Sequence, residues 1–251
     1  MRYWLVDSFT DTPFKGNPAA VVPLEAPASD DWMQAVAAEF NLSETAFLLG
    51  DELRWFTPAS EVDLCGHATL AAAHVLGGGT HAFKTRSGTL NCENAGEWIH
   101  MDFPADPPAD SAADLTAALP GTAPEFVGRG VSDVIAVLSD AAEVRAISPD
   151  AAGVAALGSR GLIVTAPGDR PDLDMVSRCF FPDVGVFEDP VTGSAHCTLA
   201  SYWAGRLGKT TLVGEQASRR GGIVRMEVRG DRVGLSGQAV TVATGELHAP
   251  G

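Results

Sequence analysis

Two short segments combine residue types that can bind a small anion and transfer a proton to or from it. Each places a glycine at the expected start of an apolar helix, directly after an acidic loop: residues 63–67 (Asp-Leu-Cys-Gly-His) and residues 189–194 (Asp-Pro-Val-Thr-Gly-Ser). Free backbone N–H groups at a helix N-terminus bind anions, and Gly66 and Gly193 let a carboxylate approach closely. Either start alone can be a simple cap, for which Thr192 and Ser194 are well suited, but the matching pair predicts anion binding.

Three further side chains can carry acid–base chemistry. Glu44 begins an apolar segment, where partial burial would raise its proton affinity, although a solvated glutamate at a strand start is equally consistent with the sequence. Asp189 precedes Pro190 and is either a second acid–base carboxylate or a turn former. His67, in the first turn of its helix, should stay neutral and either donate and accept hydrogen bonds or be a capping or core histidine.

Several cofactor and metal motifs are missing from the sequence. It contains no phosphate-binding P-loop, no dinucleotide-binding glycine motif, no zinc-protease motif and no nucleophile elbow. The 4 cysteines form no C-x-x-C pair, and no carboxylate–histidine spacing is typical of a metal site. We therefore expect neither cofactor nor metal. The N-terminus shows no export signal, which predicts a cytoplasmic protein with reduced thiols.

Composition limits the partners of the chain. Of the 251 residues, 45% are hydrophobic and 20% are charged, which is typical of a folded protein with a sizeable core. The formal net charge of −15 repels phosphate backbones and anionic lipid, so neither nucleic acid nor a membrane is expected as a partner. A small metabolite is compatible with this charge because local donors can outweigh a distant field.

The expected elements suggest an internal duplication. Helical spacing predicts a helix over 30–40 capped by Ser29 or Asp30, and apolar helices over 66–76 and 192–207. An Arg-x-Phe-x-Pro motif precedes each apolar helix, at residues 54–58 and 178–182, and the two copies lie 178 − 54 = 124 residues apart.

A two-lobed α/β (α+β) fold follows from this repeat, with each lobe a curved sheet around its own helix. We expect an N-terminal lobe over residues 1–104, which a strand at 240–251 can complete, and a C-terminal lobe over 114–239. The Pro- and Ala-rich segment 104–113 is the expected linker. In such a duplicated fold both helix starts can face one ligand in a cleft between the lobes.

Long motifs in a fixed order extend over almost the whole chain, and together they resemble the phenazine-biosynthesis (PhzF-like) isomerase family. The matching segments are residues 7–9, 16–21, 43–45, 61–69, 188–196 and 235–239. The resemblance implies a diaminopimelate-epimerase-like fold, in which two similar lobes each wrap a mostly antiparallel sheet or barrel around a central helix. It also implies a homodimer that works without cofactor or metal.

The resemblance assigns roles to individual residues. It implies that Glu44 carries a transferred proton, assisted by Asp189 and His67. It implies that a small anionic metabolite contacts Asn17, Gly66, Gly193 and Ser194. The expected reaction is therefore a proton shift within a small carboxylate-bearing substrate, by general acid–base catalysis.

One departure separates this chain from the epimerases of the same fold, which use two opposed cysteines. Cys65 occupies the first position, but the second motif carries Asp189 and Pro190, and Cys197 lies a helical turn further on. Two-cysteine racemisation is therefore disfavoured. An amino-acid racemase or epimerase that uses Glu44 with Cys65 or Asp189, and a non-catalytic metabolite-binding protein, are the alternatives. The substrate is not specified by these residues.

Overall fold

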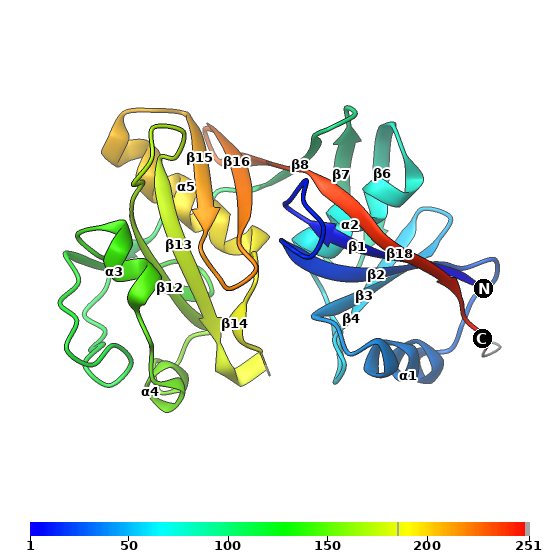
Figure 1. The fold of residues 1–251 in the computed structure, drawn as a ribbon, viewed down its shortest axis with the longest axis horizontal. Helices are drawn as coiled ribbons and strands as arrows, with labels where there is room; N and C mark the ends of the chain where they lie inside the picture. Colours follow the sequence, from blue (N-terminus) through cyan, green and yellow to red (C-terminus); the bar gives the residue numbers. More distant parts are fainter. Residues whose placement is uncertain (185, 249–251) are drawn as a thin grey trace. The chain divides into compact units, whose positions relative to one another are not determined.

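The computed structural model describes residues 1–184 and 186–248, and its elements are drawn in Figure 1. The chain divides into two compact units. The first consists of Met1–Asp102 and the segment that begins at Ser236, and the second is Phe103–Leu235. Each unit packs strands around one long helix, so the mixed, sheet-dominated α/β architecture expected from the sequence is confirmed.

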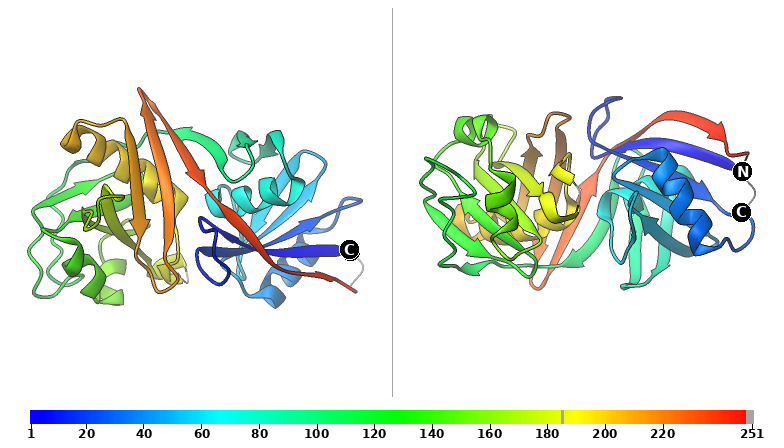
Figure 2. Two further views of the ribbon diagram at one scale, coloured as in Figure 1. Left: turned by 45° about the horizontal axis from the view of Figure 1, so that its top comes forward. Right: turned by 90° about the horizontal axis from the view of Figure 1, so that it is seen from below.

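The sheet of the first unit is built around β1, which pairs antiparallel with both β2 and β18. β18 is the last strand among the described residues and pairs with β1 over seven residues; Figure 2 draws it in red and β1 in blue. β2 is parallel to β3, and β3, β4 and β5 follow as antiparallel neighbours. The strands are β1 (Arg2–Ser8), β2 (Asn17–Pro23), β3 (Glu44–Leu49), β4 (Glu52–Phe56), β5 (Glu61–Val62), β6 (Gly79–Thr85), β7 (Gly88–Asn94), β8 (Ile99–Pro104) and β18 (Ala239–Glu246). Of the segment 240–251 expected as a strand, residues 249–251 lie outside the described residues.

Two helices pack against this sheet in different ways. α2 (Gly66–Leu76) contacts β1, β2, β3, β7 and β18, and every residue from His67 to Ala73 is buried. A helix that is apolar on all sides must be enclosed in this way. α1 (Asp30–Phe40) contacts β3 and β4, and the Ser29 hydroxyl caps it by accepting from the backbone of Trp32, so Ser29 is the cap.

The second unit repeats this order of elements. β11 is parallel to β12, then β13 and β14 follow antiparallel, and after α5 the strand β15 returns parallel to β13. In the first unit β2, β3, β4, β5, α2 and β6 follow the same sequence of pairings. The elements are β9 (Ala109–Asp110), β10 (Phe126–Arg129), β11 (Asp133–Val137), α3 (Ala141–Ala146), α4 (Ala151–Ala155), β12 (Gly161–Pro167), β13 (Met175–Phe181), η1 (Pro182–Val184), β14 (Val186–Asp189), α5 (Gly193–Leu207), β15 (Thr211–Gln216), β16 (Gly222–Arg229) and β17 (Arg232–Gly237).

The two Arg-x-Phe-x-Pro motifs make the same contacts in their respective units. Arg54 binds both carboxylate oxygens of Glu61, at 2.7 Å each. Arg178 binds both carboxylate oxygens of Glu188, at 2.6 and 3.0 Å. Each guanidinium also lies over the phenylalanine ring two residues later in the chain. The motif therefore ties β4 to β5 and β13 to β14, on the strands that lead to each long helix.

Short elements of the second unit are not anticipated by the sequence patterns. α3 and α4 have only six and five residues, and each begins after an aspartate whose side chain accepts from a backbone N–H. Their stability comes from these caps and from packing against β12 and β13, because helices this short are marginal alone. Among the described residues, no helix is long and apolar enough to cross a membrane.

Candidate active site

The first turn of α2 brings a carboxylate and an imidazole together in the first unit. Nε2 of His67 lies 3.2 Å from Oε2 of Glu44, the first residue of β3. The His67 side chain is 6% exposed and that of Glu44 is 20% exposed, so the imidazole is buried and the carboxylate is partly shielded. The two atoms are close, but their alignment does not meet the geometry of a hydrogen bond.

Two further groups contact the other ring nitrogen of His67. Nδ2 of Asn17 lies 3.3 Å from Nδ1, and Sγ of Cys65 lies 3.5 Å from the same atom. An amide nitrogen can only donate, so in this orientation Nδ1 accepts and the imidazole proton sits on Nε2. The neutral ring therefore presents an N–H toward Glu44.

Burial fixes the charge of this histidine. It lowers the pKa of His67 from 6.5 to about 3, because the imidazolium would lose its hydration without a compensating partner of sufficient strength. His67 is consequently neutral at physiological pH. It can donate a hydrogen bond to an anion, but it holds no second proton to give away.

Backbone contacts hold the cluster in place. The Ser8 hydroxyl at the end of β1 donates to the carbonyl of His67 at 2.8 Å, and the Thr69 hydroxyl donates to the carbonyl of Cys65 at 2.6 Å. Gly16, just before Asn17, has a φ of +63°, and a Cβ there would lie 2.1 Å from the Ser8 carbonyl oxygen. Only glycine allows β1 and β2 to approach this closely.

The start of α5 in the second unit is organised by a buried glutamine. Gln216 accepts from the backbone N–H of Thr192 at 2.9 Å and donates to the carbonyl of Asp189 at 2.8 Å. The Thr192 hydroxyl donates to the Asp189 carboxylate at 2.5 Å. The Asp189 carboxylate therefore lies beside the helix start, an arrangement that fits both a turn residue and an acid–base carboxylate.

An arginine that the sequence motifs do not single out reaches the same helix start. Both Nε and Nη2 of Arg160 bind the carboxylate of Asp133, which is 2% exposed, and Nη2 donates to Oγ of Ser194 at 2.9 Å. Because the guanidinium has no acceptor, Ser194 keeps its own hydroxyl proton for another group. A buried aspartate on β11 was the available signal, since such a carboxylate needs a partner.

The two helices at the candidate site residues, α2 and α5, do not use their N-cap side chains to satisfy their first N–H groups. Cys65 before α2 and Thr192 before α5 make no side-chain capping bond. Simple capping, the alternative to anion binding at Gly66 and Gly193, is thus not what these N-cap residues do. The structure brings Glu44, His67 and Asn17 together with Gly66. Separately, in the second unit, it brings Asp189 and Ser194 together with Gly193.

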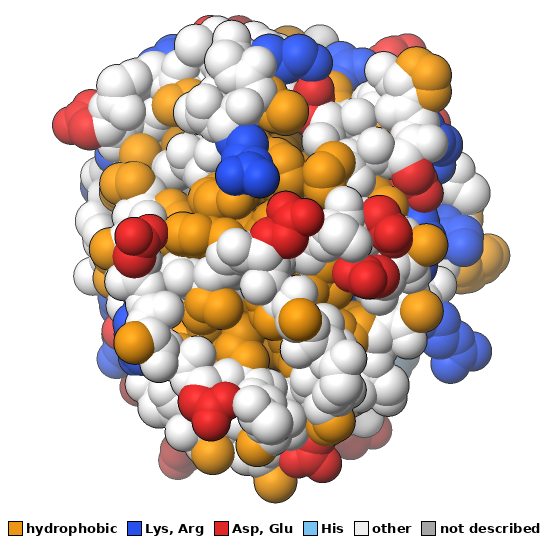
Figure 3. All heavy atoms as spheres, turned by 90° about the vertical axis from the view of Figure 1, so that its left-hand side faces the viewer, with side chains coloured by type: hydrophobic (Ala, Val, Ile, Leu, Met, Phe, Trp, Pro, Cys, Tyr) orange, Lys and Arg blue, Asp and Glu red, His pale blue; other side chains and the backbone are white. Residues whose placement is uncertain are grey.

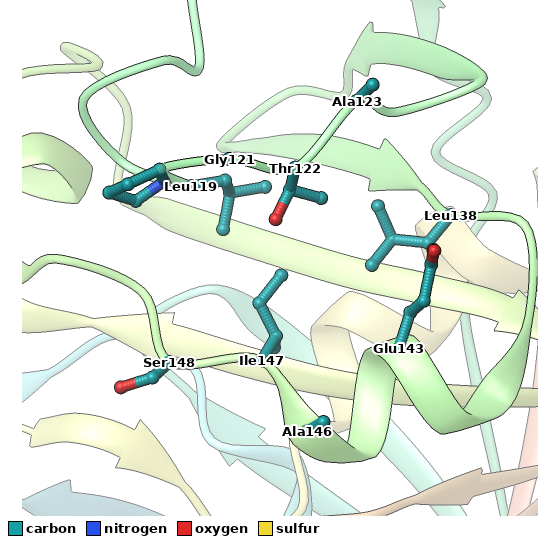
Figure 4. Close-up of a pocket in the computed structure, with 10 residues that line it drawn as sticks. Leu119, Gly121, Thr122, Ala123, Leu138, Glu143, Ala146, Ile147 and Ser148 are labelled. Carbon is teal, nitrogen blue, oxygen red and sulfur yellow. The ribbon is translucent and has the colours of Figure 1, made fainter.

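A pocket of about 540 Å³ lies elsewhere in the second unit. Figure 4 shows Ile147 and Glu143 opposite Leu119 and Thr122, and Figure 3 shows this end of the unit, with apolar side chains in shallow hollows between acidic ones. Its lining contains none of the candidate site residues, and Glu143 is its only ionisable group. One carboxylate among apolar and hydroxyl groups offers no acid–base pair.

Comparison with known proteins identifies the family of the chain. The family described as "Phenazine biosynthesis-like protein" (PhzC-PhzF) matches residues 6–245. An uncharacterized isomerase of Pseudomonas aeruginosa is 49% identical over 97% of both chains, and another of Halalkalibacterium halodurans is 46% identical over 97% of both. The human phenazine biosynthesis-like domain-containing protein is 39% identical over 98% of both chains.

Solved structures show the same relationship. A PhzF-family protein of Enterococcus faecalis superposes with a TM-score of 0.92 at 44% identity, covering 99% of both chains. A hydroxyproline epimerase of Agrobacterium vitis, with a TM-score of 0.59 at 10% identity over 98% of this chain and 91% of that one, shares the fold alone. The chain therefore belongs to the phenazine biosynthesis-like (PhzC-PhzF) family and is a PhzF-like isomerase.

Proposed function

We propose that this isomerase moves a proton within a small carboxylate-bearing metabolite, with its own side chains as acid and base and with Glu44 as the proton carrier. The observation that carries the proposal is the 3.2 Å approach of the Glu44 carboxylate to a buried, neutral His67. A partly shielded carboxylate can act as a general base, and the neutral N–H donor beside it can hydrogen-bond to the charged form.

In the proposed reaction Glu44 removes a proton from one carbon of the substrate. The C–H electron pair then forms a new double bond as an existing double bond shifts, and Glu44 returns the proton to a different carbon. The step has no net redox change, because one C–H bond breaks and another forms. His67 donates from Nε2 to the Glu44 carboxylate or to developing negative charge. A relay through its imidazolium is disfavoured by a pKa of about 3.

Roles for the helix starts belong to the same proposal. Gly66 and Gly193 begin helices whose N-cap side chains do not bond to the first backbone N–H groups, so a substrate anion can reach those groups. Ser194 keeps a hydroxyl proton to donate. We assign these groups, with Asn17, to substrate binding, and Asp189 to a supporting acid–base role. Ser194→Ala should raise KM with little change in kcat, whereas Asp189→Asn should lower kcat.

The test is solvent-deuterium incorporation, followed by ¹H NMR in heavy water, across a panel of small aromatic and cyclic amino acids. Any substrate that exchanges with the wild-type enzyme should lose about 100- to 10,000-fold in rate with Glu44→Gln. Glu52→Gln, at an exposed glutamate on β4, is the matched control and should exchange at the wild-type rate. Unchanged turnover by Glu44→Gln would remove this residue from the mechanism.

A racemase or epimerase is the second candidate, because Cys65 shares the cluster and its thiol lies 3.5 Å from Nδ1 of His67. In that reaction the proton leaves and returns at the same carbon from opposite faces, and the thiol supplies the second group. Cys65→Ser would then abolish inversion of the substrate stereocentre. In the proton shift that we favour, Cys65→Ser keeps most of its activity. Binding of panel compounds without any exchange would instead indicate a protein that binds metabolites and does not turn them over.

A further inference from the structure

The acid–base cluster of the first unit has a second chemical property. Glu44, Cys65 and His67 supply one oxygen, one sulfur and one nitrogen donor, and these three atoms all lie within 4.8 Å of one another. Carboxylate, thiolate and imidazole are the three ligand types that Zn²⁺ binds in proteins. We propose that these three side chains form a binding site for a divalent cation of the Zn²⁺ type, and that the bound ion inhibits the enzyme.

The distances suit a tetrahedral ion. Zn–N and Zn–O bonds of about 2.0 Å and a Zn–S bond of about 2.3 Å place neighbouring ligand atoms about 3.3 to 3.5 Å apart in a tetrahedral site. Nε2 of His67 and Oε2 of Glu44, at 3.2 Å, are already separated by that amount. The Cys65 sulfur lies within 4.8 Å of the other two ligand atoms, so it must move closer to them when the ion binds.

Nε2 of His67, the ring nitrogen that faces Glu44, is a second and independent indication of a bound ligand. Nε2 of His67 is buried and makes no well-aligned hydrogen bond, an arrangement that native structures rarely leave unexplained. An ion between Nε2 and the Glu44 oxygen would give this ring nitrogen a partner. The partial exposure of Glu44, at 20%, leaves a fourth coordination position for water or a substrate carboxylate.

Protons balance in the binding step. The Cys65 thiol loses its proton to solvent and the thiolate binds the ion. The imidazole stays neutral and its proton moves from Nε2 to Nδ1, where the Asn17 amide, turned by 180°, accepts it through its oxygen. One proton is released for each ion bound.

Inhibition follows because the ion occupies the atoms that the proposed proton transfer uses. This part of the inference rests on the proposed function, whereas metal binding does not. The experiment therefore measures the two separately, with the full-length enzyme stripped of metal by chelation.

Binding is measured with Zn²⁺ by calorimetry in two buffers of different ionisation enthalpy, and with Co²⁺ by its thiolate charge-transfer absorption. We expect one ion per chain, one proton released, and a thiolate band. Cys65→Ser should lose the band, and Glu44→Gln should weaken binding by at least about tenfold. Cys92→Ser is the matched control, because burial raises the pKa of the Cys92 thiol to about 12 and it lies outside the cluster. Equal Zn²⁺ affinity in wild type, Cys65→Ser and Glu44→Gln would overturn the site.

Inhibition is measured on any substrate that exchanges deuterium with the metal-free enzyme. Zn²⁺ at the concentration that fills the site should stop exchange, and chelator should restore it. Exchange that continues with the site filled overturns the inhibitory role, even where binding is confirmed. Loss of exchange in Glu44→Gln without any metal tests the proposed function by itself, so the two failures are distinguishable.

Discussion

At the scale of single residues, the protonation state of His67 decides what the cluster can do. Its neighbours are two potential donors at Nδ1 and one carboxylate at Nε2, and its pKa is about 3. These contacts select one neutral tautomer. The chemistry assigned to Glu44 depends on the Nε2–H group of His67 facing it. Asn17, the partner that fixes this tautomer, therefore matters as much as the histidine itself.

Replacing Asn17 by aspartate tests this dependence with almost no change of shape. The carboxylate accepts instead of donating, so Nδ1 should carry the proton and the pKa of His67 should rise from about 3. We expect deuterium exchange to fall by about 10- to 100-fold. Nitrogen-15 NMR of the His67 ring reads the tautomer directly. Asn91→Asp, on the exposed part of β7, is the control, and an unchanged His67 spectrum in Asn17→Asp would contradict the assignment.

His196 links stability to pH in the second unit. Burial lowers its pKa from 6.5 to about 4, while Nδ1 lies 2.7 Å from the Thr192 carbonyl oxygen. His196 therefore binds a proton more readily in the unfolded chain than in the folded one. The contribution of neutral His196 to the free energy of unfolding is complete above pH 6.5 and declines as pH falls toward 4. The slope is at most about 1.4 kcal/mol per pH unit.

Urea unfolding between pH 7.5 and pH 4.5 measures this contribution. His196→Gln should be less stable than wild type at pH 7.5, and the difference should shrink as the pH falls because the variant has no such proton to take up. Parallel stability curves for the two proteins would show that His196 is not protonated on unfolding.

At the scale of elements, the approach of β1 to β2 positions both Ser8 and Asn17. Gly16 makes this approach possible, with a φ of +63° and no room for a Cβ. Gly50 provides a natural comparison, since it has a φ of +61° and nothing within 4 Å of its would-be Cβ. At both sites a non-glycine residue would pay the free-energy cost of a positive φ. Only at position 16 would its Cβ also clash with neighbouring atoms.

Gly16→Ala should therefore destabilise the protein more than Gly50→Ala. The left-handed conformation costs alanine about 1–2 kcal/mol at either site, and the clash with the Ser8 carbonyl adds to this at position 16 alone. Gly16→Ala should also slow deuterium exchange because it displaces Asn17, while Gly50→Ala should not. Thermal unfolding and exchange rates measured together check both parts, and equal effects of the two substitutions would argue against a close approach.

At the scale of the whole molecule, the last strand belongs with the first unit. β18 pairs with β1 along its full length, and the N-terminal amine donates to the carbonyl of Leu247 at 3.1 Å. The second unit is one continuous stretch of chain, whereas the first depends on residues from both ends. Folding of the first unit therefore requires the complete chain.

Truncation after Gly237 should unfold the first unit selectively. Amides of β1, β2 and α2 should lose hydrogen-exchange protection, because β1 loses one of its two neighbours and α2 loses one covering strand. Amides of α5, β12 and β13 should stay protected. A chain that ends at His248 is the control and should match the full-length protein. Loss of protection in both units together would show that they fold as one cooperative body.

The repeated pairing order and the Arg54–Glu61 and Arg178–Glu188 pairs support duplication of one ancestral unit. The homodimer stays a prediction, to be checked by sedimentation at several protein concentrations. The repeat has diverged at the helix starts, where the first unit carries Glu44 and His67 and the second carries Arg160 and Ser194.

Local patterns in the sequence determined the elements that depend on local rules. All-round apolarity marked α2 as a buried helix, Ser29 or Asp30 was expected to cap α1, and Gly193 was expected near the start of α5. The same patterns gave too little signal for α3 and α4, because helices of one or two turns depend on their surroundings.

Glu44 and His67 could be named as candidates from sequence, since their residue types and their positions at a strand start and a helix start are local facts. Their distance, the tautomer selected by Asn17 and the partnership of Arg160 with Asp133 and Ser194 could not. Those properties arise from segments far apart in the chain that pack together. Desolvation and hydrogen-bond direction exist only once that packing has excluded water, so the tertiary structure alone decides them.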